Sequence, residues 1–357
     1  MYYSRFLYKK LFDHVNSPEI TVLTGSRQTG KSTLVKELGN QLRNEGKLVF
    51  YHTLEDIVFQ KELDENPENL FHFILKPEKD QKIIVIIDEI QYLKDPSRFL
   101  KFFFDLWADQ IKIVATGSSA FYIDQKFKDS LAGRKRLFHL SPLFFSEYLL
   151  FNQRNDLVDD LEKIRQNPGF KSINFDLIKS YFFDYLIYGG YPAVALCKTS
   201  EEKIDLLVEL KNSILKKDIQ YSGVTQLVKF FQLTQLLAAQ TGGVVNRNEL
   251  ANTLGLSNKT IESYIYILQK SFHIDLITPF FTNIRSEITK MPKVYFNDLG
   301  LRNCLINNFN KVNDRSDKGE LLENYIYNRL VEKKKSSGQI NYWRTQQGNE
   351  VDFIVTD

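Results

Sequence analysis

Short apolar runs alternate with amphipathic stretches between Glu19 and about Ser119. The runs EITVLT, KLVFYHTLE, KIIVIIDEIQYL and IKIVATGSS are apolar on both faces, whereas KSTLVKELGNQLRNEG has helical spacing. Strands that are buried on both faces and separated by helices are typical of a parallel sheet covered by helices. The pattern therefore predicts an α/β nucleotide-binding core over residues 1–140.

The pattern changes beyond Pro142. Long helical periodicities follow in FFSEYLLF, FDLIKSYFFDYLIY and EEKIDLLVELKNSILKKDI, and the YGGYP segment at residues 188–192 interrupts them as a loop or turn. We therefore expect an all-helical domain over residues 141–224. Helix, turn, helix and then strands are expected over residues 225–300, and a helix followed by strands over residues 301–357.

Composition narrows the class of protein only slightly. The 47 Lys and Arg against 44 Asp and Glu leave a net charge of +3, too weak a field to indicate nucleic acid or membrane by itself. Cys197 and Cys304 lie far apart and the five histidines show no metal-ligand spacing, so we expect neither a disulfide scaffold nor a zinc site. The sequence shows no signal-peptide pattern and no long apolar run, so we expect a cytoplasmic protein without membrane contact.

The stretch GSRQTGKST at residues 25–33 has the spacing G-x-x-x-x-G-K-S. Its glycines permit a loop whose N–H groups point at phosphate oxygens, and the helix that follows adds a favourable dipole. Lys31 can reach the phosphates and Ser32 a magnesium ion. An ordinary glycine turn is the alternative, but the strand before and the helix after favour a phosphate loop. We therefore expect ATP and Mg²⁺ to bind here, with contacts from Gly25, Ser26, Arg27, Gln28, Thr29, Gly30, Lys31, Ser32 and Thr33.

The buried run Ile83–Ile87 ends in Asp88 and Glu89. Ligands of open α/β sheets bind at the carboxyl ends of the strands, so both carboxylates are expected beside the phosphate loop. Asp88 is suited to hold the water shell of magnesium, and Glu89 to orient and deprotonate an attacking water. The alternative is a strand that simply ends in acidic turn residues.

Further polar residues are candidates for the same site. IKIVATGSS ends in Thr116 and Ser118, either of which would lie beside Asp88 if the two strands are neighbours, although a Ser-rich loop explains them equally well. LAGRKRLFHLSP supplies Arg134 and Arg136. A guanidinium at the γ-phosphate accelerates phosphoryl transfer, so Arg134 is a catalytic candidate, within one chain or across the interface of a homo-oligomer. Surface arginines, however, are usually only solvated.

Together these motifs resemble a known family. GSRQTGKST, IIDEIQYL, ATGSSA, LAGR followed by LSPLFFSEYL, then YGGYPAV and LKKDI are similar to those of a family of prokaryotic AAA-type ATPases. The resemblance covers nearly the full chain. It implies an AAA-like ATPase with a helical lid, a winged-helix unit and a C-terminal region similar to restriction-endonuclease-like folds. It also implies a sensor-like role for Ser118, beside the roles given above to residues 25–33, Asp88 and Glu89.

NRNELANTLGLSNKTIESYIYILQK predicts a helix-turn-helix, with Ser257 as the N-cap of its second helix. Apolar residues of that helix should face inward and polar ones outward: Ile261, Ile265 and Leu268 against Asn258, Lys259 and Glu262. A wing with a basic edge of Arg285, Lys290 and Lys293 would follow, able to meet DNA phosphates. Winged helices also contact proteins, so DNA and protein both stay open as partners.

In GELLENYIYNRL and INYWRTQQGNEVDFIV, Glu323 and Asp352 match the first two acids of a nuclease-like core, but no Glu-x-Lys follows. We therefore expect no nuclease activity. Two functions remain. The first is an ATPase whose nucleotide state repositions the helical and winged-helix units. The second is a non-catalytic nucleotide switch or protein-interaction module, and Glu89 favours the first because a pure binder has little need of it.

Overall fold

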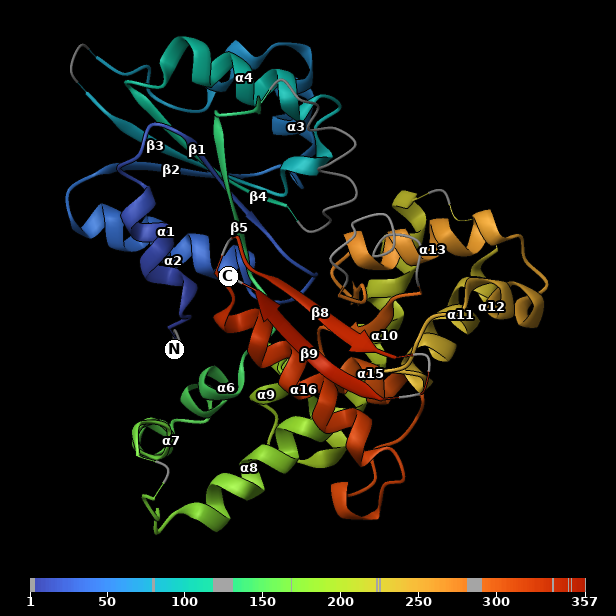
Figure 1. Cartoon of the computed structure of the whole chain (residues 1–357). Helices are drawn as coiled ribbons and strands as arrows, with labels where there is room; N and C mark the ends of the chain where they lie inside the picture. The colour runs from blue at the N-terminus through green and yellow to red at the C-terminus, as the bar shows by residue number, and fades with distance from the viewer. Residues whose placement is uncertain are drawn as a thin grey trace. The chain divides into compact units, whose positions relative to one another are not determined.

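The protein is described here by a computed structural model, which covers residues 4–78, 81–117, 131–167, 169–222, 224, 226–280, 291–335, 337–345, 347 and 349–356 (Figure 1). The chain divides into two compact units, Met1–Ser141 and Pro142–Asp357. This boundary lies one residue from the predicted end of the ATP-binding domain.

The first unit alternates strands and helices, as the sequence predicts. Its elements are α1 (Leu7–His14), β1 (Ile20–Thr24), α2 (Lys31–Asn44), β2 (Leu48–Thr53), α3 (Ile57–Glu65), the 3-10 helix η1 (Pro67–His72), β3 (Ile83–Asp88), the 3-10 helix η2 (Ile90–Tyr92), α4 (Pro96–Trp107), β4 (Ile111–Gly117) and β5 (Lys135–His139). The strands form one parallel sheet in the order β2-β3-β4-β1-β5. The strand β5 was not predicted from the sequence, because Lys135–His139 is mostly polar and forms an edge strand of the sheet.

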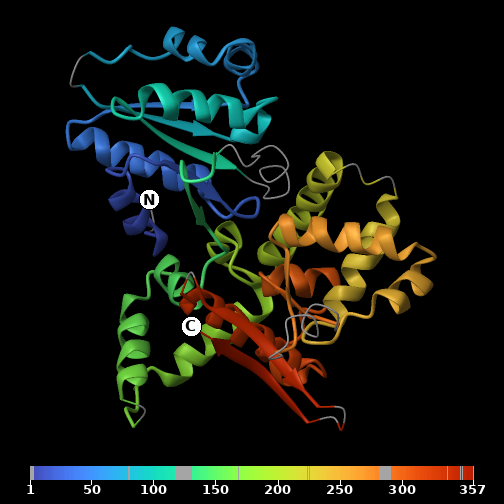
Figure 2. The same ribbon diagram turned by 45° about the horizontal axis from the view of Figure 1, so that its top comes forward.

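Alternate residues of the central strands face two separate cores, which is why those strands are continuously apolar. Ile83, Val85 and Ile87 pack with apolar side chains of α3 and α4, whereas Ile84 and Ile86 pack with those of α1 and α2. Figures 1 and 2 show these helix pairs on opposite faces of the sheet. The layers leave the carboxyl ends of the strands open for the loops that follow them.

The second unit is mainly helical. Its elements are α6 (Phe145–Phe151), α7 (Asn155–Gln166), α8 (Phe175–Tyr188), α9 (Pro192–Ala195), α10 (Ser200–Ser222), α11 (Leu227–Ala239), α12 (Arg247–Leu254), α13 (Asn258–Lys270), β6 (Ile274–Ile277), β7 (Lys293–Phe296), α15 (Leu299–Leu305), the 3-10 helix η4 (Val312–Asp314), α16 (Lys318–Lys333), β8 (Gln339–Arg344) and β9 (Glu350–Thr356). Among the residues covered by the structure, no helix is both long and apolar enough to cross a membrane.

The predicted helix-turn-helix geometry is present in α12 and α13. Gly255 follows α12 with φ +64°, a left-handed conformation that glycine adopts without steric cost, and the Ser257 side chain accepts the Thr260 N–H at the start of α13. The inner and outer faces of α13 are as predicted: Ile261, Ile265 and Leu268 are buried, and Asn258, Lys259 and Glu262 are exposed. The antiparallel pair β6 and β7 follows.

Candidate nucleotide-binding site

The segment from Gly25 to Gly30 leaves β1 and ends where α2 begins. Three of its residues have positive φ: Gly25 (+149°), Gln28 (+61°) and Gly30 (+93°). A Cβ on Gly25 would lie 2.2 Å from the Leu140 carbonyl oxygen, so only glycine fits there. These backbone turns shape the chain into a loop at the N-terminus of α2, where N–H groups and the helix dipole favour a phosphate.

Lys31 is the first residue of α2, and its side chain is folded back over this loop. Its Nζ donates to the carbonyl oxygens of Gly25, at 3.0 Å, and Ser26, at 2.7 Å. The Thr29 hydroxyl donates to the same Ser26 carbonyl at 2.9 Å. The Ser26 hydroxyl is buried and has no hydrogen-bond partner in the described part of the chain. An unpartnered hydroxyl beside a buried ammonium fits a site whose partners include a bound anion.

Asp88 ends β3, and two hydroxyls from its neighbouring strands hold its carboxylate. Tyr51, on β2, donates to Oδ2 at 2.7 Å, and Thr116, on β4, donates to Oδ1. Burial raises the pKa of Tyr51, and the bond to Asp88 raises it further, so the phenol stays a donor. The expectation that Thr116 lies beside Asp88 is met because β3 and β4 are paired. Asp88 is thus fixed in one orientation at the sheet edge that carries the phosphate loop.

Glu89 follows with φ +61° and ψ +50°, a left-handed conformation that is uncommon for a residue with a side chain. Its backbone N–H donates to Thr116 Oγ1 at 3.0 Å, and the Gln91 side chain donates to its carboxylate. Such backbone outliers gather at functional sites, where surrounding contacts hold them. The geometry therefore presents Glu89 as a positioned carboxylate next to Asp88.

The other two predicted catalytic residues have different outcomes. Ser118 lies outside the described residues. Arg134 lies just before β5, and its carbonyl accepts the N–H of Ile20 at the start of β1, whereas the phosphate loop follows the end of β1. β1 and β5 are parallel, so Arg134 lies at the amino ends of the strands, whereas the phosphate loop lies at their carboxyl ends. A five-residue strand separates the two ends by about 16 Å. There its Nε pairs with Asp105 Oδ1 at 2.7 Å. A role for Arg134 at the γ-phosphate of its own chain does not fit this position.

Sequence reasoning missed Tyr51 and Gln91. Tyr51 lies in the middle of a run whose pattern indicates only a strand, and the order of the strands decides that it meets Asp88. Gln91 offered a weak signal, because it follows Glu89 by two residues and lies within the 3-10 helix Ile90–Tyr92. No residue pattern in one sequence gives strand order, so Tyr51 had no signal of its own.

A second group of charged side chains lies in the second unit, around Lys293. Lys293 Nζ is 3.2 Å from Glu323 Oε1 and 3.5 Å from Asp352 Oδ1, and it also pairs with Glu350. Although burial opposes it, the bond to Glu350 and the charge of Glu323 raise the pKa of Lys293. Two expectations are corrected here. Lys293 is buried, with a side chain only 4% exposed, so it is no part of a basic wing edge. Glu323 and Asp352 are also not alone, because Glu350 and Lys293 lie beside them, and neither neighbour was predicted from the sequence.

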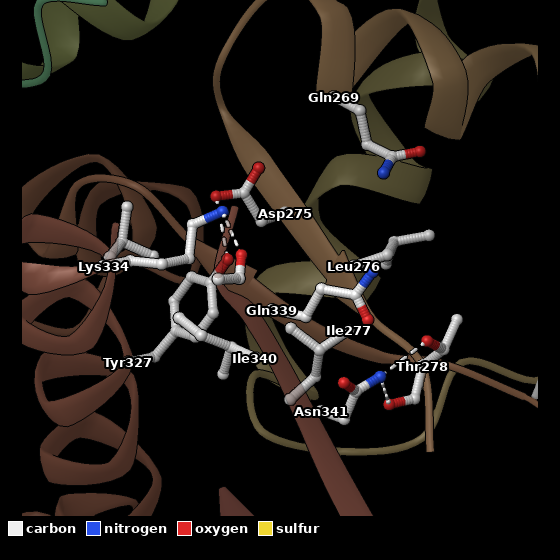
Figure 3. A pocket seen from close by; sticks show the side chains of 12 residues that line it. Gln269, Asp275, Leu276, Ile277, Thr278, Tyr327, Lys334, Gln339, Ile340 and Asn341 are labelled. Carbon is white, nitrogen blue, oxygen red and sulfur yellow. Dashed lines mark hydrogen bonds between the residues drawn. The ribbon is translucent and has the colours of Figure 1, made fainter. Parts of the chain in front are cut away.

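A cavity of about 420 Å³ lies in the second unit between β6, α16 and the start of β8 (Figure 3). The Tyr327 hydroxyl donates to Asp275 at 3.0 Å, Lys334 donates to the Gly338 carbonyl at 2.9 Å, and Asn341 donates to Thr278. These polar groups bond within the protein, so we assign the cavity no ligand. The other two predicted wing cations, Arg285 and Lys290, lie outside the described residues.

Three known families match separate parts of the chain. Residues 17–149 match the family described as AAA domain. The first unit, with its parallel sheet and flanking helices, fits a P-loop domain of the AAA type. Residues 179–312 match a domain of unknown function, DUF8612, and residues 318–357 match another, DUF4143. The AAA match covers the phosphate loop, Asp88, Glu89 and Thr116 together.

Two relatives from different organisms match nearly the whole of this chain and are longer than it. The uncharacterized protein MJ1637 of Methanocaldococcus jannaschii is 26% identical, over 94% of this chain and 72% of its own length. An uncharacterized protein of Haemophilus influenzae is 24% identical, over 97% of this chain and 82% of its own length. Among solved structures, AMPPCP-bound DnaA from Aquifex aeolicus has 16% identity and a TM-score of 0.35, over 74% of this chain and 86% of that one.

Proposed function

We propose that the chain binds Mg·ATP at residues 25–33 and hydrolyses it to ADP and phosphate. One observation carries the proposal: the phosphate loop after β1, the Asp88–Glu89 pair after β3 and Thr116 on β4 lie at the carboxyl ends of adjoining strands. Phosphoryl transfer needs positioning and charge compensation more than covalent chemistry, and these residue types supply both.

Each side chain has a definite part in that reaction. Lys31 would exchange the carbonyls of Gly25 and Ser26 for oxygens of the β- and γ-phosphates, with which its charge interacts more strongly. The Ser32 hydroxyl and the Asp88 carboxylate suit magnesium, which prefers oxygen ligands and retains several waters. Magnesium, when bound, neutralises charge on the phosphate oxygens.

In this proposal Glu89 acts on the attacking water. Its carboxylate would accept a proton from the attacking water as the oxygen forms a bond to the γ-phosphorus and the bond to the bridging oxygen breaks. The hydrogen bond from Gln91 and the link from its N–H to Thr116 limit its movement. A base held in this way costs little reorganisation during the reaction.

The alternative is a nucleotide switch with negligible turnover. Titration calorimetry with Mg·ATP tests binding, and steady-state phosphate release tests hydrolysis. Binding with release above a Lys31→Ala control supports the ATPase. Binding without release supports the switch, and absence of binding overturns both.

We further propose that the helical region is a lid, that the α12–α13 helix-turn-helix with β6 and β7 is a winged helix, and that nucleotide state repositions it on a partner. DNA is the partner we favour. With Lys293 buried, the basic edge is reduced to Arg285 and Lys290, so log affinity against log salt should fall with a slope of roughly −2. Fluorescence anisotropy with duplex DNA tests this, and no binding at low salt would return the unit to protein contacts.

Catalysis by Arg134 across a homo-oligomer interface is tested by mixing Arg134→Ala with Lys31→Ala protein, since rescue of turnover requires the interface.

A further inference from the structure

Arg5 connects the phosphate loop to the end of the first unit. It lies just before α1 and is 5% exposed. Its Nη1 donates to the Thr29 carbonyl at 2.9 Å, and its Nη2 donates to the Ser141 carbonyl at 2.7 Å. Thr29 belongs to the phosphate loop, and Ser141 is the last residue of the first unit. One guanidinium therefore bridges two segments that are otherwise far apart in the sequence.

Ser141 belongs to a short junction whose two sides are firmly held. On the first side, the Leu140 N–H donates to the Thr24 carbonyl at 2.8 Å, directly before the phosphate loop. On the second side, the Leu143 N–H donates to the Gly190 carbonyl at 2.7 Å, and the Leu143 carbonyl accepts the Tyr185 hydroxyl at 2.9 Å. Only Ser141 and Pro142 lie between these anchors, and proline has a fixed φ. The junction therefore has few ways to absorb a displacement of Ser141.

The loop end of the bridge is sensitive to phosphate. The Ser26 carbonyl accepts both the Lys31 ammonium, at 2.7 Å, and the Thr29 hydroxyl, at 2.9 Å. Phosphate oxygens compete for the ammonium, so a bound nucleotide weakens the first of these bonds. The Thr29 hydroxyl then becomes the main donor to the Ser26 carbonyl. The carbonyl of Thr29 itself accepts the hydrogen bond from Arg5. A change at the phosphates thus reaches Arg5 through two adjoining hydrogen bonds.

We propose that Arg5 is a positioning residue that couples occupancy of the phosphate loop to the Ser141–Pro142 junction, and through Leu143 to the second unit. The inference rests on the proposed binding of ATP. It deepens that function by naming the link through which nucleotide state leaves the first unit. A ligand can shift such a link only by interacting differently with its two arrangements, which the exchange of partners at Lys31 provides.

The bridge requires arginine in particular. Its planar guanidinium offers parallel N–H donors to two carbonyls at once, whereas the lysine ammonium is a point charge on a flexible stem. Arg5→Lys therefore keeps the positive charge beside the loop and loses the bridge. Arg5→Gln removes both. Arg43→Gln is a matched control, because Arg43 Nε donates to the Val49 carbonyl at 3.1 Å elsewhere in the same unit.

The test is hydrogen exchange of the full-length chain, with and without magnesium and AMPPCP, read at the Leu143 amide. In the wild type, the nucleotide analogue should change exchange at Leu143 by about fivefold or more, the lower end of typical coupling. In Arg5→Lys and Arg5→Gln, calorimetry should find analogue affinity within about threefold of wild type. The change at Leu143 should be lost in both, while Arg43→Gln should retain it.

The outcomes separate this inference from the proposed function. A wild type that does not bind the analogue overturns both. A wild type that binds but shows no change at Leu143 overturns the coupling and leaves ATP binding intact. A variant that binds the analogue and keeps the wild-type change at Leu143 also overturns it. If Arg5→Gln does not fold, as circular dichroism would show, Arg5→Lys decides the question, since it preserves the buried charge.

Discussion

The backbone N–H of Gly190 donates a 2.7 Å hydrogen bond to Asp298 Oδ2, joining residues 108 positions apart. The other oxygen, Oδ1, accepts the N–H of Leu301 at 2.7 Å, so the same carboxylate also caps α15. The YGGYP turn and the start of α15 are thereby locked together in the second unit. The approach is so close that a Cβ on Gly189 would lie 2.4 Å from Asp298 Oδ1.

Gly189→Ala is expected to destabilise the second unit. Gly189 has φ +75° and ψ −162°, a region that is essentially restricted to glycine and costs a residue with a Cβ about 1 to 3 kcal/mol, and the clash with Asp298 adds about 1 to 3 kcal/mol. Urea denaturation of the full-length chain measures the loss. Gly319→Ala is the control, because Gly319 lies in α16 with open space around it and no positive φ. We expect that control to be neutral or to stabilise the helix by up to about 1 kcal/mol. Equal effects of the two changes would contradict the close packing at Gly189.

Asp298 also predicts a dependence of stability on pH. Burial raises its pKa to about 6, from an ordinary value of 3.8, so the folded state binds the proton more tightly than the unfolded state. The contribution of Asp298 to the free energy of unfolding is therefore fully present below pH 3.8 and is lost as pH rises through about 6. For a shift of about two units the loss amounts to roughly 3 kcal/mol.

The comparison with Asp298→Asn isolates that contribution, because other carboxyl groups titrate in both proteins. Among them is Asp317, whose pKa Arg315 and Arg302 lower to about 2 despite its burial. The free energy of unfolding of the wild type, relative to the variant, should fall between pH 4 and pH 7. A difference that is constant over this range would show that Asp298 ionises normally.

Local pattern was enough to predict four strands of the first unit and the loop between β1 and α2. The apolar runs gave four of the strands, and the spacing of Gly25, Gly30 and Lys31 gave the loop, since both signals depend on neighbours in sequence. Contacts between residues far apart in the sequence could not be predicted from local pattern. The bond from Tyr51 to Asp88 depends on strand order, and the contacts of Lys293 with Glu323 and Asp352 join three elements. Lys293 was assigned to the basic edge of a wing because the residues next to it in the sequence do not indicate contacts with Glu323 or Asp352.

Lys31→Ala is expected to abolish Mg·ATP binding. Lys31 is the ammonium that the loop holds over its own carbonyls, and its loss leaves the phosphates without that compensation. Titration calorimetry with Mg·ATP measures the effect. Lys10→Ala, an exposed change on α1, is the control and should bind as the wild type does. Equal affinity in Lys31→Ala would remove the loop from the binding site.

Glu89→Gln is expected to retain nucleotide affinity and to slow hydrolysis by about 10² to 10⁴, the usual value of a positioned base. Glutamine has nearly the same shape and can still bond Gln91, but it cannot take a proton from water. Phosphate release at saturating ATP gives the rate, and calorimetry gives the affinity. Glu65→Gln, at the exposed end of α3, should keep wild-type turnover. Wild-type turnover in Glu89→Gln would assign the base to another residue.

The chain is expected not to cut nucleic acid, despite three carboxylates near one another in the C-terminal region. Hydrolysis by a metal ion requires the carboxylates to bind the ion, yet Glu323, Glu350 and Asp352 already pair with the buried ammonium of Lys293. Lys293→Met would remove this partner and should destabilise the second unit, by less than the roughly 3 to 5 kcal/mol of a fully buried pair, because the three carboxylates are partly exposed. Plasmid nicking with Mg²⁺ or Mn²⁺ is the direct assay for the wild type. Nicking that disappears in Asp352→Ala would overturn the prediction, because it would show that the carboxylates bind a catalytic metal even with Lys293 in place.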